Sequence, residues 1–110
     1  METKTPIELT CPDCRGPVSE HRFESLVEYR CLVGHAFSPR SILDAHCDAQ
    51  EKALWAAVVA LEEASNLANI VAPQFKPEAA QKLKEQGERK AVQARQIREV
   101  LEHLEPFQLD

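Results

Sequence analysis

Four residues in the first third of the chain constrain its fold more than any other feature. Cys11 and Cys14 are separated by two residues, and Cys31 and His35 follow across a gap of hairpin length. Three thiolates and one imidazole form a ligand set that suits tetrahedral Zn²⁺. The spacing therefore predicts that a structural Zn²⁺ is bound by Cys11, Cys14, Cys31 and His35.

Other uses of these cysteines are conceivable, namely a disulfide, free buried thiols, a redox Cys-x-x-Cys motif or an iron site. Redox motifs of this kind sit beside a βαβ pattern, which the sequence does not show. Three Cys and one His without further ligands favour zinc over iron. A glycine stands near each pair of ligands, and we expect Gly16 and Gly34 to adopt the positive φ of the two ligand-bearing turns.

The residues around these ligands are expected to form a small antiparallel ribbon. Segments 17–22 and 26–31 are predicted strands joined by a turn at Glu24 and Ser25, and residues 1–10 are a lead-in with a brief strand around Ile7 and Leu9. So few residues cannot be held together by burial alone. Structural zinc sites in small fingers contribute about 10–16 kcal/mol of apparent binding free energy. We therefore assign residues 1–37 to a zinc ribbon.

The remaining residues, 38–110, are predicted to form a two-helix antiparallel hairpin. Ser38 is a suitable N-cap before Pro39, and the first helix can continue to about Ala72. Prolines then break the pattern, and a second helix can run over residues 77–103. The apolar stripe of the first helix comprises Leu43, Cys47, Leu54, Ala57, Val58, Leu61, Ala64, Ala68 and Ala72, and that of the second Ala80, Leu83, Gly87, Ala94, Ile97, Leu101 and Leu104.

The first helix carries more apolar residues than one partner helix can cover. Residues 53–61 are uninterrupted apolar, and Trp55 and Val59 project onto the otherwise polar side. We interpret Trp55 and Val59 as a contact surface. The surface that covers them is another part of this chain, a second copy in a homodimer, or a different protein. The expected fold class is thus α+β and mostly helical, a zinc ribbon followed by a long, coiled-coil-like helical hairpin.

Charge and composition restrict the partners. The formal net charge of −5 repels phosphate backbones, so nucleic-acid binding is disfavoured, although a zinc-ribbon transcriptional regulator remains the alternative function. Neither an apolar run of transmembrane length nor a signal-peptide core is evident, so we expect no membrane span and a cytoplasmic location, where thiols stay reduced.

Cys47 is expected to be a structural residue of the first helix. His46, beside it, is an alternative metal ligand.

Three segments of the chain, 11–17, 29–38 and 53–63, together resemble the C-terminal extension of bacterial CheB-type chemotaxis protein-glutamate methylesterases and its small stand-alone relatives. The resemblance spans about residues 9–65 and departs from the family at Ser19 and at the Glu24–Ser25 turn. It implies a signalling context and a bacterial source. It does not imply catalysis, because methylesterase activity belongs to a different domain with a Ser-His-Asp site.

The sequence contains no Gly-x-Ser-x-Gly motif, and four protein ligands would leave the metal no open position for a catalytic water. We therefore expect no enzymatic activity. The function that the sequence favours is a zinc-binding protein-interaction or scaffolding module, working through a protein partner or through self-association.

Overall fold

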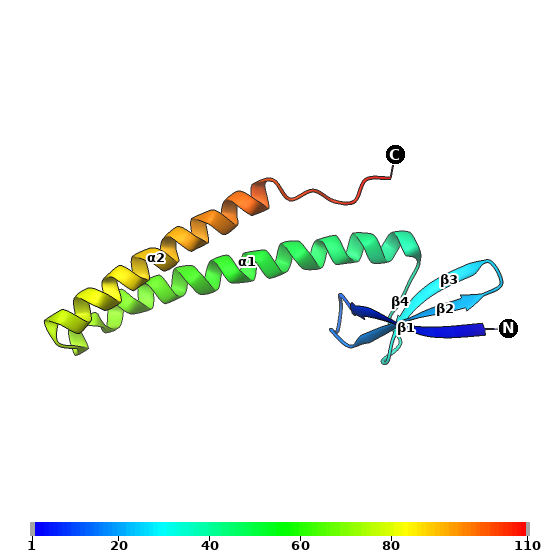
Figure 1. Ribbon diagram of the computed structural model, residues 1–110, viewed down its shortest axis with the longest axis horizontal. Helices are drawn as coiled ribbons and strands as arrows, with labels where there is room; N and C mark the ends of the chain where they lie inside the picture. Colours follow the sequence, from blue (N-terminus) through cyan, green and yellow to red (C-terminus); the bar gives the residue numbers. More distant parts are fainter. Residues whose placement is uncertain (1, 110) are drawn as a thin grey trace. The chain divides into compact units, whose positions relative to one another are not determined.

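The computed structural model describes residues 2–109 and has the expected α+β, mostly helical fold, an antiparallel sheet followed by two long helices (Figure 1). The elements in chain order are β1 (Glu2–Thr10), β2 (Pro17–Phe23), β3 (Leu26–Cys31), β4 (Ala36–Phe37), α1 (Pro39–Val71), the 3₁₀ turn η1 (Ala72–Gln74) and α2 (Pro77–Glu102).

The chain divides within α1 into two compact units. The first extends to Gln50 and includes the residues from Pro106 on, and the second runs from Glu51 to Glu105. The sequence-based division between residues 37 and 38 falls where the sheet ends and the helices begin, and as a domain boundary it stays a prediction.

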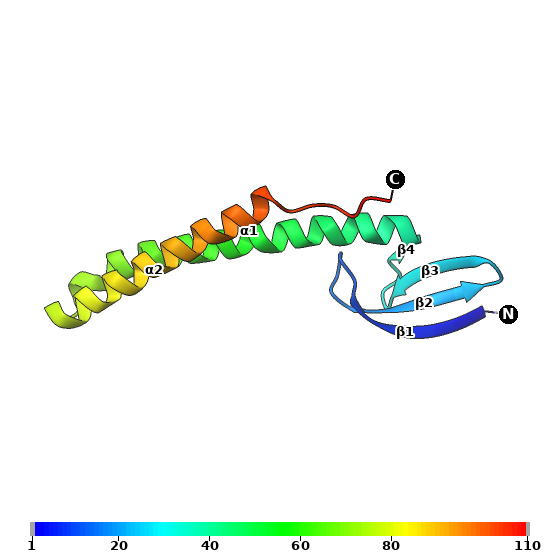
Figure 2. The ribbon, with the colours of Figure 1, turned by 45° about the horizontal axis from the view of Figure 1, so that its top comes forward.

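The first unit contains a four-stranded antiparallel sheet in the order β1-β2-β3-β4 (Figure 2). The two predicted strands and their turn are present. The lead-in expected for residues 1–10 is instead the nine-residue strand β1, whose polar first half has no apolar alternation to signal it. The two-residue strand β4 was not expected, because a pair of residues is too short to show any periodicity.

The core of this unit lies between the sheet and the first turns of α1. Cys11, Val18, Cys31 and Ile42 are buried together, and four partly buried apolar side chains pack around them: Ile7, Leu9, Tyr29 and Phe37. Ile42 comes from α1, so the start of the helix supplies part of the cover over the cysteines. So small an apolar cluster is consistent with a unit that needs a further stabiliser.

Ser38 ends the sheet and begins α1, as predicted. Its hydroxyl oxygen accepts the amide N–H of Ser41 at 3.0 Å, and its own N–H donates to the Ser41 hydroxyl at 2.9 Å. This reciprocal arrangement satisfies one of the amide groups that the first turn of a helix leaves free. Pro39 occupies the first helical position, where a missing N–H has no cost.

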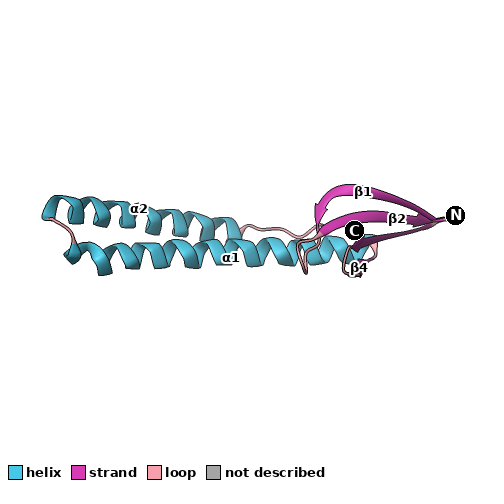
Figure 3. Cartoon of the chain, turned by 90° about the horizontal axis from the view of Figure 1, so that it is seen from below, coloured by secondary structure: helices cyan, strands magenta, loops and turns pink. Residues whose placement is uncertain are grey.

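The second unit is an antiparallel helical hairpin of α1, η1 and α2 (Figure 3). Arg98, near the end of α2, meets the middle of α1: its guanidinium lies 5.3 Å from the centre of the Trp55 ring and 2.9 Å from the Glu62 carboxylate. Nearer the turn, Gly87 lies against Ala68. The buried residues, all on the predicted stripes, are Val58, Ala68, Ala72, Gly87 and Ala94.

The α1–η1 stretch, Pro39–Gln74, is long and apolar enough to qualify as a membrane span by length and composition alone. One such helix is weak evidence for a span. The mostly buried core helix of a soluble protein passes the same test, whereas only 17 % of this apolar window is buried.

Candidate metal centre

The first ligand-bearing turn is closed by backbone hydrogen bonds. The N–H of Cys11 donates to the Gly16 carbonyl at 2.7 Å, and the N–H of Arg15 donates to the Cys11 carbonyl at 2.8 Å. The expectation that Gly16 has positive φ is wrong, because Arg15 adopts that conformation, with φ of 64°. Gly16 matters instead for space, since a Cβ there would lie 3.4 Å from the Cys14 sulfur.

The second ligand-bearing turn follows the expectation. The N–H of Cys31 donates to the His35 carbonyl at 3.0 Å, and Gly34, with φ of 102°, donates to the Cys31 carbonyl at 3.2 Å. The His35 amide also points at the Cys31 sulfur, at 3.3 Å. Such amide-to-sulfur contacts stabilise a thiolate over a thiol, which is the form that binds metal.

The structure brings the four predicted ligands together, with one donor atom from each lying within 4.8 Å of the other three. The distances are 3.6 Å between the Cys14 and Cys31 sulfurs, 3.6 Å from the Cys11 sulfur to His35 Nδ1, and 3.3 Å from the Cys31 sulfur to the same nitrogen. Zn–S bonds of about 2.3 Å and Zn–N bonds of about 2.0 Å place tetrahedral ligands roughly 3.5–3.8 Å apart. The cluster therefore has nearly the size of a tetrahedral metal site.

Burial and charge differ among the ligands. Cys11 and Cys31 are buried, His35 is half-buried and Cys14 is exposed. Burial opposes ionisation of Cys31, but the amides of His35 and Val33 prevail and lower the pKa of its thiol to about 6. At Cys14 the Gly16 amide favours the thiolate, yet burial and the neighbouring sulfurs together raise the pKa. One thiol of the cluster is thus prepared to ionise at neutral pH without any ion present.

The cysteines of the cluster are not joined by a disulfide in the structure. All four cysteines are free, and the 3.6 Å between Cys14 and Cys31 far exceeds the roughly 2.05 Å of an S–S bond. Across the described range, 2–109, no second group of three or more metal-ligating side chains comes together. The cluster can hold a metal ion, and a soft donor set of three sulfurs and one nitrogen is compatible with zinc.

The other candidate residues lie elsewhere. Cys47 lies half-buried on α1 outside the cluster, and His46 beside it contacts Gln50 at 3.1 Å instead of replacing a ligand. His21 pairs with the Glu2 carboxylate at 2.8 Å, and His103 with the Glu99 carbonyl at the end of α2.

Trp55 and Val59 are both exposed on α1, although Trp55 lies close enough to α2 to be contacted by Arg98. With Leu67 and Ile70 they form a surface that we call the outer apolar face of α1, whose four side chains are exposed by 43, 49, 56 and 70 % in sequence order. Arg98 covers one side of the indole and leaves the rest open. Of the ten exposed residues between Ala53 and Val71, only Glu63 is charged.

Sequence reasoning missed Ile42 as a core residue over the cysteines. The predicted apolar stripe of the first helix began at Leu43 and did not include Ile42. The comparisons with known proteins add no relative, because no protein-family model, no curated protein and no solved structure matches this chain.

Proposed function

We propose that this chain is a non-enzymatic zinc-binding module that presents its helical hairpin to a protein partner in bacterial signal transduction. The observation that carries the proposal is the cluster of three sulfurs and one imidazole nitrogen, in which three of the separations are 3.3–3.6 Å and all lie within 4.8 Å. Zn²⁺ bound there would cross-link the two ligand-bearing turns. In this unit the sheet and a few buried side chains offer little other stabilisation.

The absence of catalysis in this proposal rests on the number of ligands. A catalytic zinc keeps a position open for water or substrate, whereas four protein ligands fill a tetrahedral site. The depressed pKa of Cys31 is then a property of a metal ligand and not of a nucleophile.

The interaction function rests on the outer apolar face of α1, where Trp55 and Val59 are the proposed anchors. Exposed apolar surface on a helix at this density is typical of a protein–protein contact. The resemblance of residues 9–65 to the extension of chemotaxis methylesterases supports the signalling context and a bacterial source. A second copy of the chain and a different protein are both acceptable occupants of this face.

Metal analysis and light scattering on one purified sample test the proposal. We expect one zinc per chain, with Trp55 emission shifted to the red in a monomer and to the blue in a dimer that covers the indole. Val59→Asp should abolish dimer or partner binding and leave the zinc content unchanged, and Glu63→Gln serves as a control without an apolar loss. Metal-free chain that retains its sheet would refute the zinc assignment, and full binding by the Val59→Asp variant would refute the interaction surface.

A further inference from the structure

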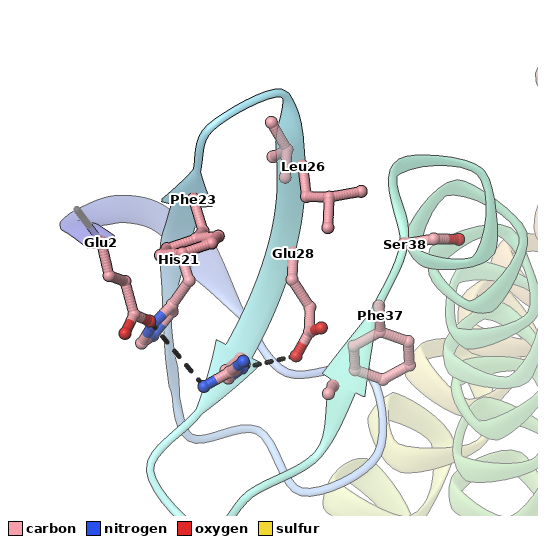
Figure 4. A pocket seen from close by; sticks show the side chains of 10 residues that line it. Glu2, His21, Phe23, Leu26, Glu28, Phe37 and Ser38 are labelled. Carbon is pink, nitrogen blue, oxygen red and sulfur yellow. Dashed lines mark hydrogen bonds and ion pairs between the residues drawn. The ribbon is translucent and has the colours of Figure 1, made fainter.

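The sheet carries a groove whose lining includes none of the four metal ligands. It has a volume of about 620 Å³, and Figure 4 shows several of the side chains that line it. The lining residues come from all four strands and from the residue that precedes α1: Glu2, His21, Phe23, Leu26, Val27, Glu28, Arg30, Ala36, Phe37 and Ser38. This volume lies within the usual range of roughly 300–1,000 Å³ for ligand sites.

One side of the groove is a strand edge that β4 leaves open. β4 pairs only with Tyr29 and Arg30, so within the described residues the first half of β3 has no strand on that side. β4 cannot continue, because the Ser38 amide is taken up by Ser41 and Pro39 has no N–H. Backbone groups on such an edge, without a neighbouring strand, can pair with another strand.

The register identifies the backbone groups that face this edge. Phe23 pairs with Leu26 across a two-residue turn, and the pairs alternate from there in their hydrogen bonding. Leu26 and Glu28 therefore bond to β2, and the N–H and C=O of Val27 point to the open side. The bond from the Cys31 N–H to His35, four residues further along the same edge, agrees with this alternation.

The side chains in the groove combine apolar surface with excess negative charge. Phe23 and Leu26 are exposed by 49 % and 71 %. Arg30 is paired with Glu28 and lies 3.9 Å from Glu2, so two carboxylates share one guanidinium. With histidine neutral, this leaves a formal charge of −1 in the groove of a chain whose net charge is −5. Such a surface attracts a basic partner.

We propose that the groove binds an extended, basic peptide segment of a partner protein, which adds a strand antiparallel to Leu26–Glu28. An added strand forms backbone hydrogen bonds with the edge, and every second side chain of that strand contacts the groove face of the sheet. Directly opposite residues lie about 4.5–5.5 Å apart at Cβ. A lysine or arginine thus faces Glu28, and an apolar residue two positions away faces Leu26.

Titration of the zinc-loaded, ¹⁵N-labelled chain with the blocked peptide Thr-Val-Thr-Lys-Thr-Val-Thr tests this proposal by NMR. We expect shift changes at Phe23, at Val27 and Glu28, and at Phe37. An N-methylated peptide of the same sequence, which keeps the charge but loses amide donors, should not bind. Glu28→Lys should weaken binding roughly tenfold, because an opposite-charge pair becomes a like-charge pair. Glu20→Lys makes the same charge change on the other face of the sheet and should leave binding unaltered.

Three results would overturn the proposal: no shift changes at millimolar peptide, equal binding of the N-methylated peptide, or changes confined to the helices. Shift changes at the same residues that depend on chain concentration without peptide would assign the edge to a second copy instead. The Val59→Asp variant should bind the peptide normally, so failure here is distinguishable from failure of the proposed interaction surface on α1.

Discussion

Gly87 sits in the interior of α2, where an isolated helix would gain about 1 kcal/mol from alanine in its place. The packing argues for the opposite result. A Cβ at this position would lie 2.9 Å from the Cβ of Ala68 and 3.3 Å from the Ser65 carbonyl oxygen. Overpacking of this kind typically costs about 1–3 kcal/mol, because the helix axes must separate. We therefore expect Gly87→Ala to lower the free energy of unfolding by about 1 kcal/mol net.

Urea unfolding of the full chain, followed by helical circular dichroism at one fixed concentration, measures this change. The substitution Ala68→Gly removes the opposing methyl group. The free energy of unfolding of the Gly87→Ala, Ala68→Gly double variant should therefore exceed the value expected from the sum of the two single effects by about 1 kcal/mol or more. Gln86→Ala, at an exposed neighbouring position, is the control and should change stability by less than about 0.5 kcal/mol. Gly87→Ala as stable as the natural chain, or more stable, would show that the helices do not approach closely here.

Three further outcomes follow from local geometry. Glu24 adopts a left-handed φ of 56°, so Glu24→Gly should stabilise the β2–β3 turn by about 1 kcal/mol, seen as slower amide exchange, and unchanged or faster exchange would contradict this. Ser38→Ala removes the N-cap of α1 and should cost about 1 kcal/mol in thermal unfolding, whereas an unchanged midpoint would mean the cap contributes nothing. The hydrogen bond to His21 lowers the pKa of the Glu2 carboxyl from its ordinary value. The contribution of this pair to stability is therefore present above that ordinary value and is lost as the pH falls through the lowered pKa. An NMR titration of the Glu2 carboxyl in the natural chain and in His21→Ala checks this, and the same pKa in both would exclude the cause.

The sequence predicted those parts of the fold that carry a strong local signal. Ser38 and Pro39 marked the start of α1, and Pro77 marked the start of α2, within the bounds that the structure shows. The apolar stripes placed Val58 and Gly87 correctly in the contact between the helices. In each case the residues that decide the structure are adjacent or regularly spaced. Their pattern therefore predicts the element without knowledge of contacts distant in the sequence.

The features that were missed depend on partners far along the chain. The polar start of β1 becomes a strand only because β2 offers hydrogen bonds to it, and β4 exists only because the second ligand-bearing turn folds back onto β3. Positive φ at Arg15 was assigned to its glycine neighbour, since composition indicates that a turn occurs but not which residue takes the strained conformation. The groove beside Leu26 likewise has no sequence signal, because it arises where β4 stops.

The central claim is that a metal ion held by the four-ligand cluster stabilises the sheet unit. The most direct test is the ¹⁵N spectrum of the chain before and after exhaustive chelation, with zinc measured on the same samples. We predict one zinc per chain, and on its removal the loss of dispersed signals from β2 and β3. A metal-free sample whose sheet signals remain dispersed would contradict the account.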